Sequence, residues 1–220
     1  YIPNNTFISA WSAAIRVYGS KYVEAIQCDP DTYNLKVDQK SIEGLEQDSA
    51  FLCIHNIGSI VNIPEFHRIR PDIIIIEDNC EGFMGKYNGI KTGSFKNTLA
   101  SSISFYANKL ISCGEGGAFL TNDEEIYNHI KMIRSHGSSK ETYIHPIAGN
   151  NFRITNVQAA FLFEQVLDIE NIIKNKKRVY QSYRELLFQL EPEVKCIKTV
   201  KNTESSYWVN AINIFKGSYE

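Results

Sequence analysis

Three side chains of the kinds used in covalent catalysis stand near one another in the middle of this 220-residue sequence. Asp78 closes an apolar run, Ser104 lies in a later run, and Lys109 comes five residues after Ser104. Because ligands of open α/β sheets bind outside the carboxyl ends of strands, we expect the three to share one sheet edge. A lysine amine can form a Schiff base, an aspartate can keep a pyridine nitrogen protonated, and a hydroxyl can bind phosphate. The trio therefore suits a phosphorylated pyridine cofactor.

Each of these residues also has an ordinary explanation when it is taken alone. An aspartate after a strand commonly starts a turn, and a lysine in a loop rich in Ser, Asn and Gly is usually solvated. Ser104 alone is a strand serine, and the glycine-rich stretch at 114–117 alone is a turn. His55 ends another apolar run and is a further candidate at the same edge. The prediction of a site therefore depends on the combination.

The elements that must position these residues follow an alternating pattern. Short apolar runs separated by helical periodicity predict an α/β fold with a mostly parallel sheet covered by helices. An Asn-Gly pair at 88–89 predicts a tight hairpin. Strands are predicted at 21–27, 51–55, 72–77, 102–106, 117–121 and 207–215.

Helix signals occupy the stretches between and after these strands. Thr121 with Glu124 has the spacing of a capping box, and a helix through Ile133 should stop near Gly137. The stretch 155–158 has the same spacing and predicts a second helix. Asp168 is placed to cap a third helix that runs to about residue 187.

Composition limits the class of protein. The formal net charge is −2, hydrophobic residues make up 43% of the chain, and no block of Lys and Arg occurs. We therefore expect no nucleic-acid partner and no membrane insertion. Five scattered cysteines without a Cys-x-x-Cys pair indicate reduced thiols, with neither a disulfide framework nor a metal site. A cytoplasmic location is expected.

Several stretches together resemble the DegT/DnrJ/StrS-type sugar aminotransferases, which belong to fold type I of the pyridoxal-phosphate enzymes. The matching stretches occur in order along nearly the whole chain. They are TFI (6–8), DPDTYN (29–34), EDNCEGFMG (77–85), SFYANK (104–109), RSHG (134–137) and NFRITNVQAA (151–160).

The resemblance implies a domain organisation. Residues 1–165 would form the cofactor-binding large domain, whose sheet is mostly parallel. Residues 166–220 would form a linking helix and the start of a smaller C-terminal α+β domain. The family's Gly-Thr/Ser phosphate loop should precede Thr6, so we expect further protein before Tyr1 and after Glu220.

The resemblance also implies roles around the cofactor, pyridoxal 5′-phosphate, which becomes pyridoxamine phosphate during turnover. Lys109 would hold the cofactor as a Schiff base and shuttle the proton. Asp78 would pair with the pyridinium nitrogen, and Ser104 would bind the phosphate. Phe7 would stack on the ring, although a core aromatic is an equal explanation. Glu81 stands near the ring, where many relatives carry His or Gln and perosamine-synthase-like members carry Glu.

Further roles concern the partner subunit and the substrate. Asn151 would reach the cofactor phosphate of a neighbouring subunit, so that a homodimer shares its two sites. Arg153 is either a substrate-side cation or a structural group at the dimer interface. His55 is a candidate substrate contact.

The implied reaction transfers an amino group from an amino acid, expected to be L-glutamate, to a keto sugar. The acceptor would be a nucleotide-linked 6-deoxyhexose, with C4 the expected carbon. A related sugar dehydratase is one alternative, but those relatives carry histidine in place of the Schiff-base lysine, so Lys109 argues against it. A decayed family member that serves as a binding scaffold is the other.

Overall fold

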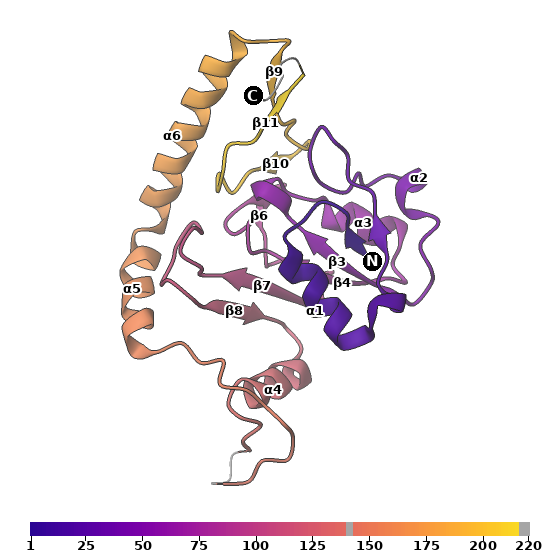
Figure 1. Ribbon diagram of the computed structural model, residues 1–220, viewed down its shortest axis with the longest axis vertical. Helices are drawn as coiled ribbons and strands as arrows, with labels where there is room; N and C mark the ends of the chain where they lie inside the picture. The colour runs from indigo at the N-terminus through magenta and orange to yellow at the C-terminus, as the bar shows by residue number, and fades with distance from the viewer. Residues whose placement is uncertain (140–142, 216–220) are drawn as a thin grey trace.

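The computed structural model describes residues 1–139 and 143–215 of the chain. Its centre is a four-stranded sheet in the order β3-β4-β7-β8 (Figure 1). The first three strands run parallel, and β8 is antiparallel to β7. The fold is therefore α/β with a mostly parallel core, as predicted. The strands are β3 (Ala50–Ile54), β4 (Ile74–Asp78), β7 (Ala100–Ser104) and β8 (Gly117–Leu120).

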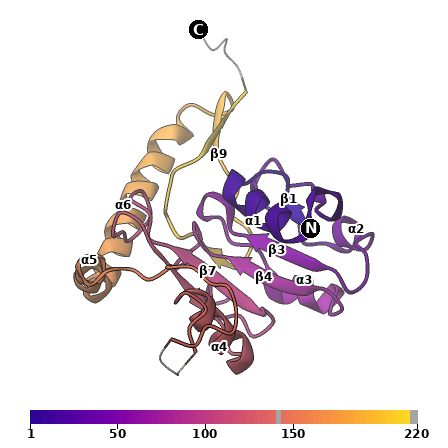
Figure 2. The same ribbon diagram turned by 60° about the horizontal axis from the view of Figure 1, so that its bottom comes forward.

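Helices cover both faces of this sheet. Alternate side chains of β3 point to opposite faces, and because both sets are apolar, each face must be covered. Phe51 and Cys53 are fully buried on one face, where the Phe51 ring stacks on Phe66 of α3 (Ile63–Ile69) at 4.8 Å. Ile54 packs on the other face against Ala10 of α1 (Ile8–Tyr18). Figure 2 shows the strands between the two helices. Each fully buried large apolar side chain contributes roughly 1.5–3 kcal/mol.

Short elements extend this core. β1 (Ile2–Pro3) pairs in parallel with β2 (Ala25–Ile26), and α2 (Gln39–Ile42) lies beside α3. The hairpin of β5 (Lys86–Tyr87) and β6 (Ile90–Lys91) is joined by β10 (Thr203–Glu204). Through the pairing of β10 with β5, the C-terminal part of the chain contacts the middle of the sequence.

The second half of the chain leaves the sheet and returns to it (Figure 1). After α4 (Glu124–Ile133) a segment extends away from the sheet before α5 (Asn156–Leu167) begins. The long α6 (Ile169–Phe188) then leads to β9 (Val194–Cys196), which pairs with β11 (Ile212–Ile214). The predicted boundary between residues 165 and 166 falls inside α5, and the division into two domains stays a prediction.

The strand predictions locate the four strands of the central sheet, but the two predicted strands outside that sheet are much too long. Only Ala25–Ile26 of the predicted strand 21–27 is extended, because Ser20–Tyr22 forms a 3₁₀ turn. Only Ile212–Ile214 of the predicted strand 207–215 is a strand. Tyr207 has a φ of 56°, which turns the chain out of the extended conformation.

Local signals predicted the turns and caps with mixed success. Thr155 forms the predicted capping box with Gln158. The box predicted at Thr121 is wrong: Asp123 caps α4 by accepting from Ile126 N, and the Thr121 hydroxyl donates to the carbonyl of Leu99, just before β7. Asn88 and Gly89 both have positive φ, as the predicted hairpin turn requires. Among the described residues, no helix combines the length and apolar character needed to cross a membrane.

Candidate active site

Two of the predicted site residues end neighbouring strands of the sheet. Asp78 is the last residue of β4 and lies opposite Ser102 of β7, and Ser104 is the last residue of β7. The Asp78 Oδ1 atom accepts from Cys80 N at 3.0 Å, and the Ser104 hydroxyl accepts from Tyr106 N at 3.2 Å. The parallel register therefore brings the carboxylate and the hydroxyl to the same edge, as the sequence predicts.

Lys109 lies in the turn that follows β7, with its backbone N–H donating to Tyr106 O. Its side chain is only 14% exposed, and Nζ lies 3.5 Å from Oε1 of Glu81. The amine also lies 4.2 Å from the centroid of the Trp208 ring. Lys109 is thus held between a carboxylate and an aromatic face.

The Cys80 thiol lies near these groups, and the charges of Asp78 and Lys109 both affect its pKa. Burial is the largest cause that raises its pKa to about 12, followed by the charge of Asp78 and a hydrogen bond with it. A bond with Ser102 and the charge of Lys109 oppose that rise. The charges of Asp78 and Lys109 thus have opposite effects on the pKa of the same thiol.

Glu81 connects Lys109 to the turn that follows β3. Its Oε2 accepts from the backbone N–H of Ile57 at 2.7 Å, and its Oε1 faces the lysine. Ile57 has a φ of 51°, which is costly for a β-branched residue and is held only where neighbours enforce it. The predicted contact of Glu81 with the cofactor ring stays a prediction, and the structure places this carboxylate beside the amine of Lys109.

The geometry does not support a substrate contact by His55, because its ring is fully buried and both nitrogens are occupied. Nδ1 accepts from Val61 N at 3.1 Å, which places the hydrogen on Nε2. Nε2 therefore donates to Oε1 of Glu77 at 2.8 Å, and Glu77 also accepts from Gly93 N. His55 is a packing and hydrogen-bonding residue beneath the site.

Three other predicted residues lie on the surface of the described chain. Phe7 stands at the start of α1 and is 70% exposed. Asn151 pairs with Ser135 at the base of the segment between α4 and α5, and Arg153 donates from Nε to Asn151 Oδ1 at 3.2 Å. None of the contacts found within the described ranges joins these three to Lys109. Their roles toward a cofactor, a substrate or a second subunit stay predictions.

Trp208 and Ser206 reach the Lys109 region without having been predicted there. The indole Nε1 of Trp208 donates to Asn108 O at 2.7 Å, and Ser206 donates to Glu81 O at 2.5 Å. The apolar character of 207–215 favoured a strand instead. No local pattern could have found these contacts, because they join segments far apart in the sequence.

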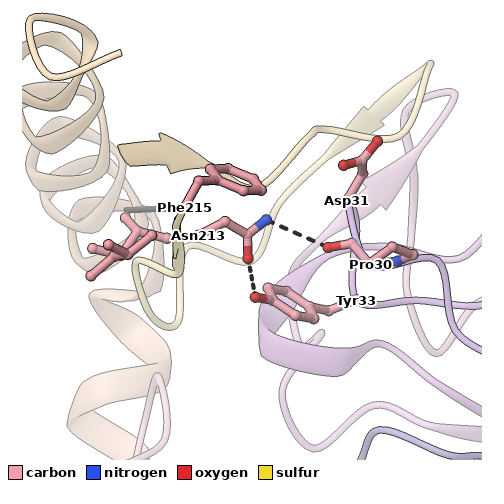
Figure 3. A pocket seen from close by; sticks show the side chains of 7 residues that line it. Pro30, Asp31, Tyr33, Asn213 and Phe215 are labelled. Atoms are coloured by element: carbon pink, nitrogen blue, oxygen red, sulfur yellow. Dashed lines mark hydrogen bonds between the residues drawn. The ribbon is translucent and has the colours of Figure 1, made fainter. Parts of the chain in front are cut away.

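A separate cavity of about 430 Å³ lies beside β11 (Figure 3). Asn213 lines it, and its side chain accepts from the Tyr33 hydroxyl and donates to Pro30 O. None of the predicted site residues lines this cavity. Within residues 1–139 and 143–215, no cluster of His, Cys, Asp and Glu is arranged to hold a metal ion.

The donor set at the sheet edge fits pyridoxal 5′-phosphate. A poorly exposed amine suits an aldehyde, a carboxylate suits a protonated ring nitrogen, and a hydroxyl at the end of a strand suits a phosphate. Lys109, Asp78 and Ser104 supply these three groups at one edge. The residues present therefore match the cofactor that the sequence implies.

Comparison with known proteins gives consistent matches. The family model described as the DegT/DnrJ/EryC1/StrS aminotransferase family matches residues 1–218. GDP-perosamine synthase of Caulobacter vibrioides is 28% identical, over 98% of this chain and 58% of its own length.

Solved structures have the same fold. A Brucella abortus aminotransferase of this family matches with a TM-score of 0.80 at 26% identity, over 96% of this chain and 57% of its own. The E. coli GDP-4-keto-6-deoxy-D-mannose-3-dehydratase with bound hydrated PLP matches with a TM-score of 0.83 at 25% identity. The match covers 99% of this chain and 59% of the dehydratase chain. The chain thus spans somewhat more than half the length of the relatives it matches.

Proposed function

The chain belongs to the DegT/DnrJ/EryC1/StrS aminotransferase family, and on that premise we propose that it carries the catalytic lysine of a nucleotide-sugar aminotransferase. The reaction moves an amino group from an amino acid to a keto sugar attached to a nucleotide. The observation that carries the proposal is the gathering of Lys109, Asp78 and Ser104 at one edge of the sheet.

Pyridoxal 5′-phosphate supplies an aldehyde for the lysine and a ring that accepts carbanion charge. With the cofactor bound, Asp78 would hold a proton at the ring nitrogen and Ser104 would bind the phosphate. The Lys109 amine would carry a proton between the substrate carbon and the cofactor. The low exposure of Lys109 helps to exclude water from this proton transfer.

The second subunit is part of the proposal. Asn151 is exposed, in keeping with a contact to the phosphate in a neighbouring subunit. The segment between α4 and α5, to which it belongs, extends away from the sheet (Figure 1). A homodimer would then share its two sites. Mixing Lys109→Ala and Asn151→Asp subunits should restore activity, because half of the sites in mixed dimers carry neither change. Absence of recovery, with subunit exchange confirmed by native mass spectrometry, would contradict this.

For the substrate we propose a nucleotide-linked 4-keto-6-deoxyhexose that is aminated at C4, with L-glutamate as the donor. Support comes from the relatives, among which GDP-perosamine synthases of several bacteria stand out. We place the reaction in the cytoplasm, where nucleotide sugars are made and thiols such as the five here stay reduced.

A sugar dehydratase is the second candidate, because one well-matched structure is a GDP-4-keto-6-deoxy-D-mannose-3-dehydratase. Lys109 argues for transamination, since the dehydratases are expected to carry histidine at this position. The two activities give different products, because amination adds nitrogen whereas dehydration removes a hydroxyl.

The test incubates protein from the complete reading frame with pyridoxal phosphate, L-glutamate and a panel of keto sugar nucleotides. Mass spectrometry and NMR then identify the product. A 4-amino sugar supports the proposal. A deoxygenated keto sugar would assign the dehydratase, and no product with any panel member would favour a scaffold.

A further inference from the structure

Residues 203–208 form a strap that crosses the carboxyl edge of the sheet. Ser206 N donates to Gly58 O at 3.1 Å, and the Ser206 hydroxyl donates to Glu81 O. Trp208 Nε1 donates to Asn108 O at 2.7 Å. Gly58, Glu81 and Asn108 follow β3, β4 and β7 respectively, so the strap meets the ends of three neighbouring parallel strands. This is the edge where ligands of such sheets bind.

The strap approaches the first of these turns closely. A Cβ atom at position 58 would overlap the hydroxyl oxygen of Ser206, and Gly58 has a φ of 79°. Ser206 itself is 2% exposed. The contact therefore depends on glycine at position 58 and fixes the direction in which the chain continues toward Trp208.

The other end of the strap is held by ion pairs. Glu204 lies 3.0 Å from Lys86 of β5 and 3.1 Å from Lys177 of α6. The Tyr207 ring packs against Tyr180 of α6 at 5.2 Å between centroids. The strap is thus attached to α6 and to the β5-β6 hairpin, outside the region of Lys109.

Trp208 is the strap residue that contacts the reactive amine. Its ring centroid lies 4.2 Å from Lys109 Nζ, on the aromatic face that attracts cations. Because Nε1 is bonded to Asn108 O, the indole cannot rotate away without losing that bond. The carboxylate of Glu81 lies on the same amine, with Oε1 3.5 Å from Nζ.

We propose that Trp208 is a positioning residue for Lys109. A lysine side chain has four rotatable bonds, and holding its amine in one direction raises the fraction of molecules ready to react. The indole face supplies that restraint, and the strap forms one wall of the site. This inference rests on the proposed function, because it gives Trp208 a role only if Lys109 is the Schiff-base lysine.

The test compares Trp208→Phe, Trp208→Leu and wild-type protein from the complete reading frame. The rate of Schiff-base formation is followed by absorbance after pyridoxal phosphate is added to cofactor-free protein, and the midpoint of thermal unfolding is measured in parallel. Trp208→Leu should slow the reaction about tenfold, whereas Trp208→Phe, which keeps an aromatic face, should stay within about threefold. If the role of Trp208 were purely structural, Trp208→Leu would lower the midpoint of thermal unfolding, but Trp208→Leu and Trp208→Phe would form the Schiff base at similar rates.

A second measurement does not depend on the Trp208 variants folding. The 220-residue chain has two tryptophans, so Trp11 is replaced by Phe, and any tryptophan that the complete reading frame adds is replaced likewise, which leaves Trp208 as the single tryptophan emitter. Pyridoxal phosphate bound at Lys109 should quench most of its fluorescence, and Lys109→Ala should reduce that quenching. Unquenched emission, or equal reaction rates in Trp208→Leu and wild type, would overturn the inference. Failure of wild type itself to form the Schiff base would overturn the proposed function.

Discussion

His55 and Glu77 form a fully buried pair in which Nε2 donates to Oε1 at 2.8 Å. The other nitrogen of His55 accepts from Val61 N. Replacement of His55 by Ala would remove a hydrogen-bond donor from the buried Glu77 carboxylate. It would also leave the backbone N–H of Val61 without its acceptor. We expect a loss of about 3 kcal/mol in the free energy of unfolding.

The activity of this variant separates a packing role from substrate binding. At a temperature where His55→Ala remains folded, the KM for the sugar nucleotide should match that of wild type. The control is His129→Ala on the exposed side of α4, which should change stability by less than about 0.5 kcal/mol. A raised KM with unchanged stability would restore His55 as a substrate contact.

Gly82 tests how tightly this buried histidine is packed. A Cβ atom at position 82 would overlap the side chain of His55, which both of its hydrogen bonds hold in place. Gly82→Ala should therefore lower the free energy of unfolding by about 2 kcal/mol. Gly44→Ala is the matched control, because nothing lies within 4 Å of the added atom. Equal stability of the two variants in urea would show that the turn after β4 can relax.

Glu204 gives a prediction about pH. Hydrogen bonds from Lys86, and then from Lys177, lower its pKa below the ordinary value of 4.5, against the opposing effect of burial. A lowered folded-state pKa stabilises the fold above the ordinary pKa, and this stabilisation is lost as the pH falls toward the folded-state pKa. Glu204→Gln should therefore lower the free energy of unfolding by about 1 kcal/mol at pH 7 and by much less at pH 3.

Urea unfolding at the two pH values measures this difference. Glu170→Gln is the control, since its partner Lys91 is 3.7 Å away and its side chain is 80% exposed. If Glu204→Gln lowered the free energy of unfolding equally at pH 7 and pH 3, the ion pairs of Glu204 with Lys86 and Lys177 would not stabilise the strap.

Asp78→Asn tests the carboxylate at the end of β4. The fold should be retained, because asparagine has the same shape and can still accept from Cys80 N. Turnover should fall by about 100-fold or more, since an amide cannot hold the ring nitrogen in its protonated form. Asp48→Asn on the exposed surface is the control and should leave kcat unchanged. Wild-type turnover by Asp78→Asn would assign another carboxylate, with Glu81 the first to examine.

The sequence predicts those parts of the molecule that depend on local patterns. Apolar runs located β3, β4, β7 and β8, and the spacing of Thr155 and Gln158 located the start of α5. The ends of parallel strands then placed Asp78 and Ser104 together. The resemblance to a known family supplied the roles of these residues.

Contacts between distant segments have no signal in the local sequence. Trp208 reaches Lys109 because Tyr207 turns the chain and Ser206 bonds to two loops, and neither feature has a local sequence signal. His55 was expected at the surface of the site because it ends an apolar run. Its burial depends on Glu77 and Val61, whose positions only the packed sheet determines.

The most direct test of the account is the identity of the lysine that binds the cofactor. Protein from the complete reading frame is loaded with pyridoxal phosphate, reduced with borohydride and digested, and the modified peptide is sequenced by mass spectrometry. We expect one modified residue, Lys109, and loss of the modification in Lys109→Ala. Modification of a different lysine, or none in the wild-type protein, would contradict the assignment of the active site.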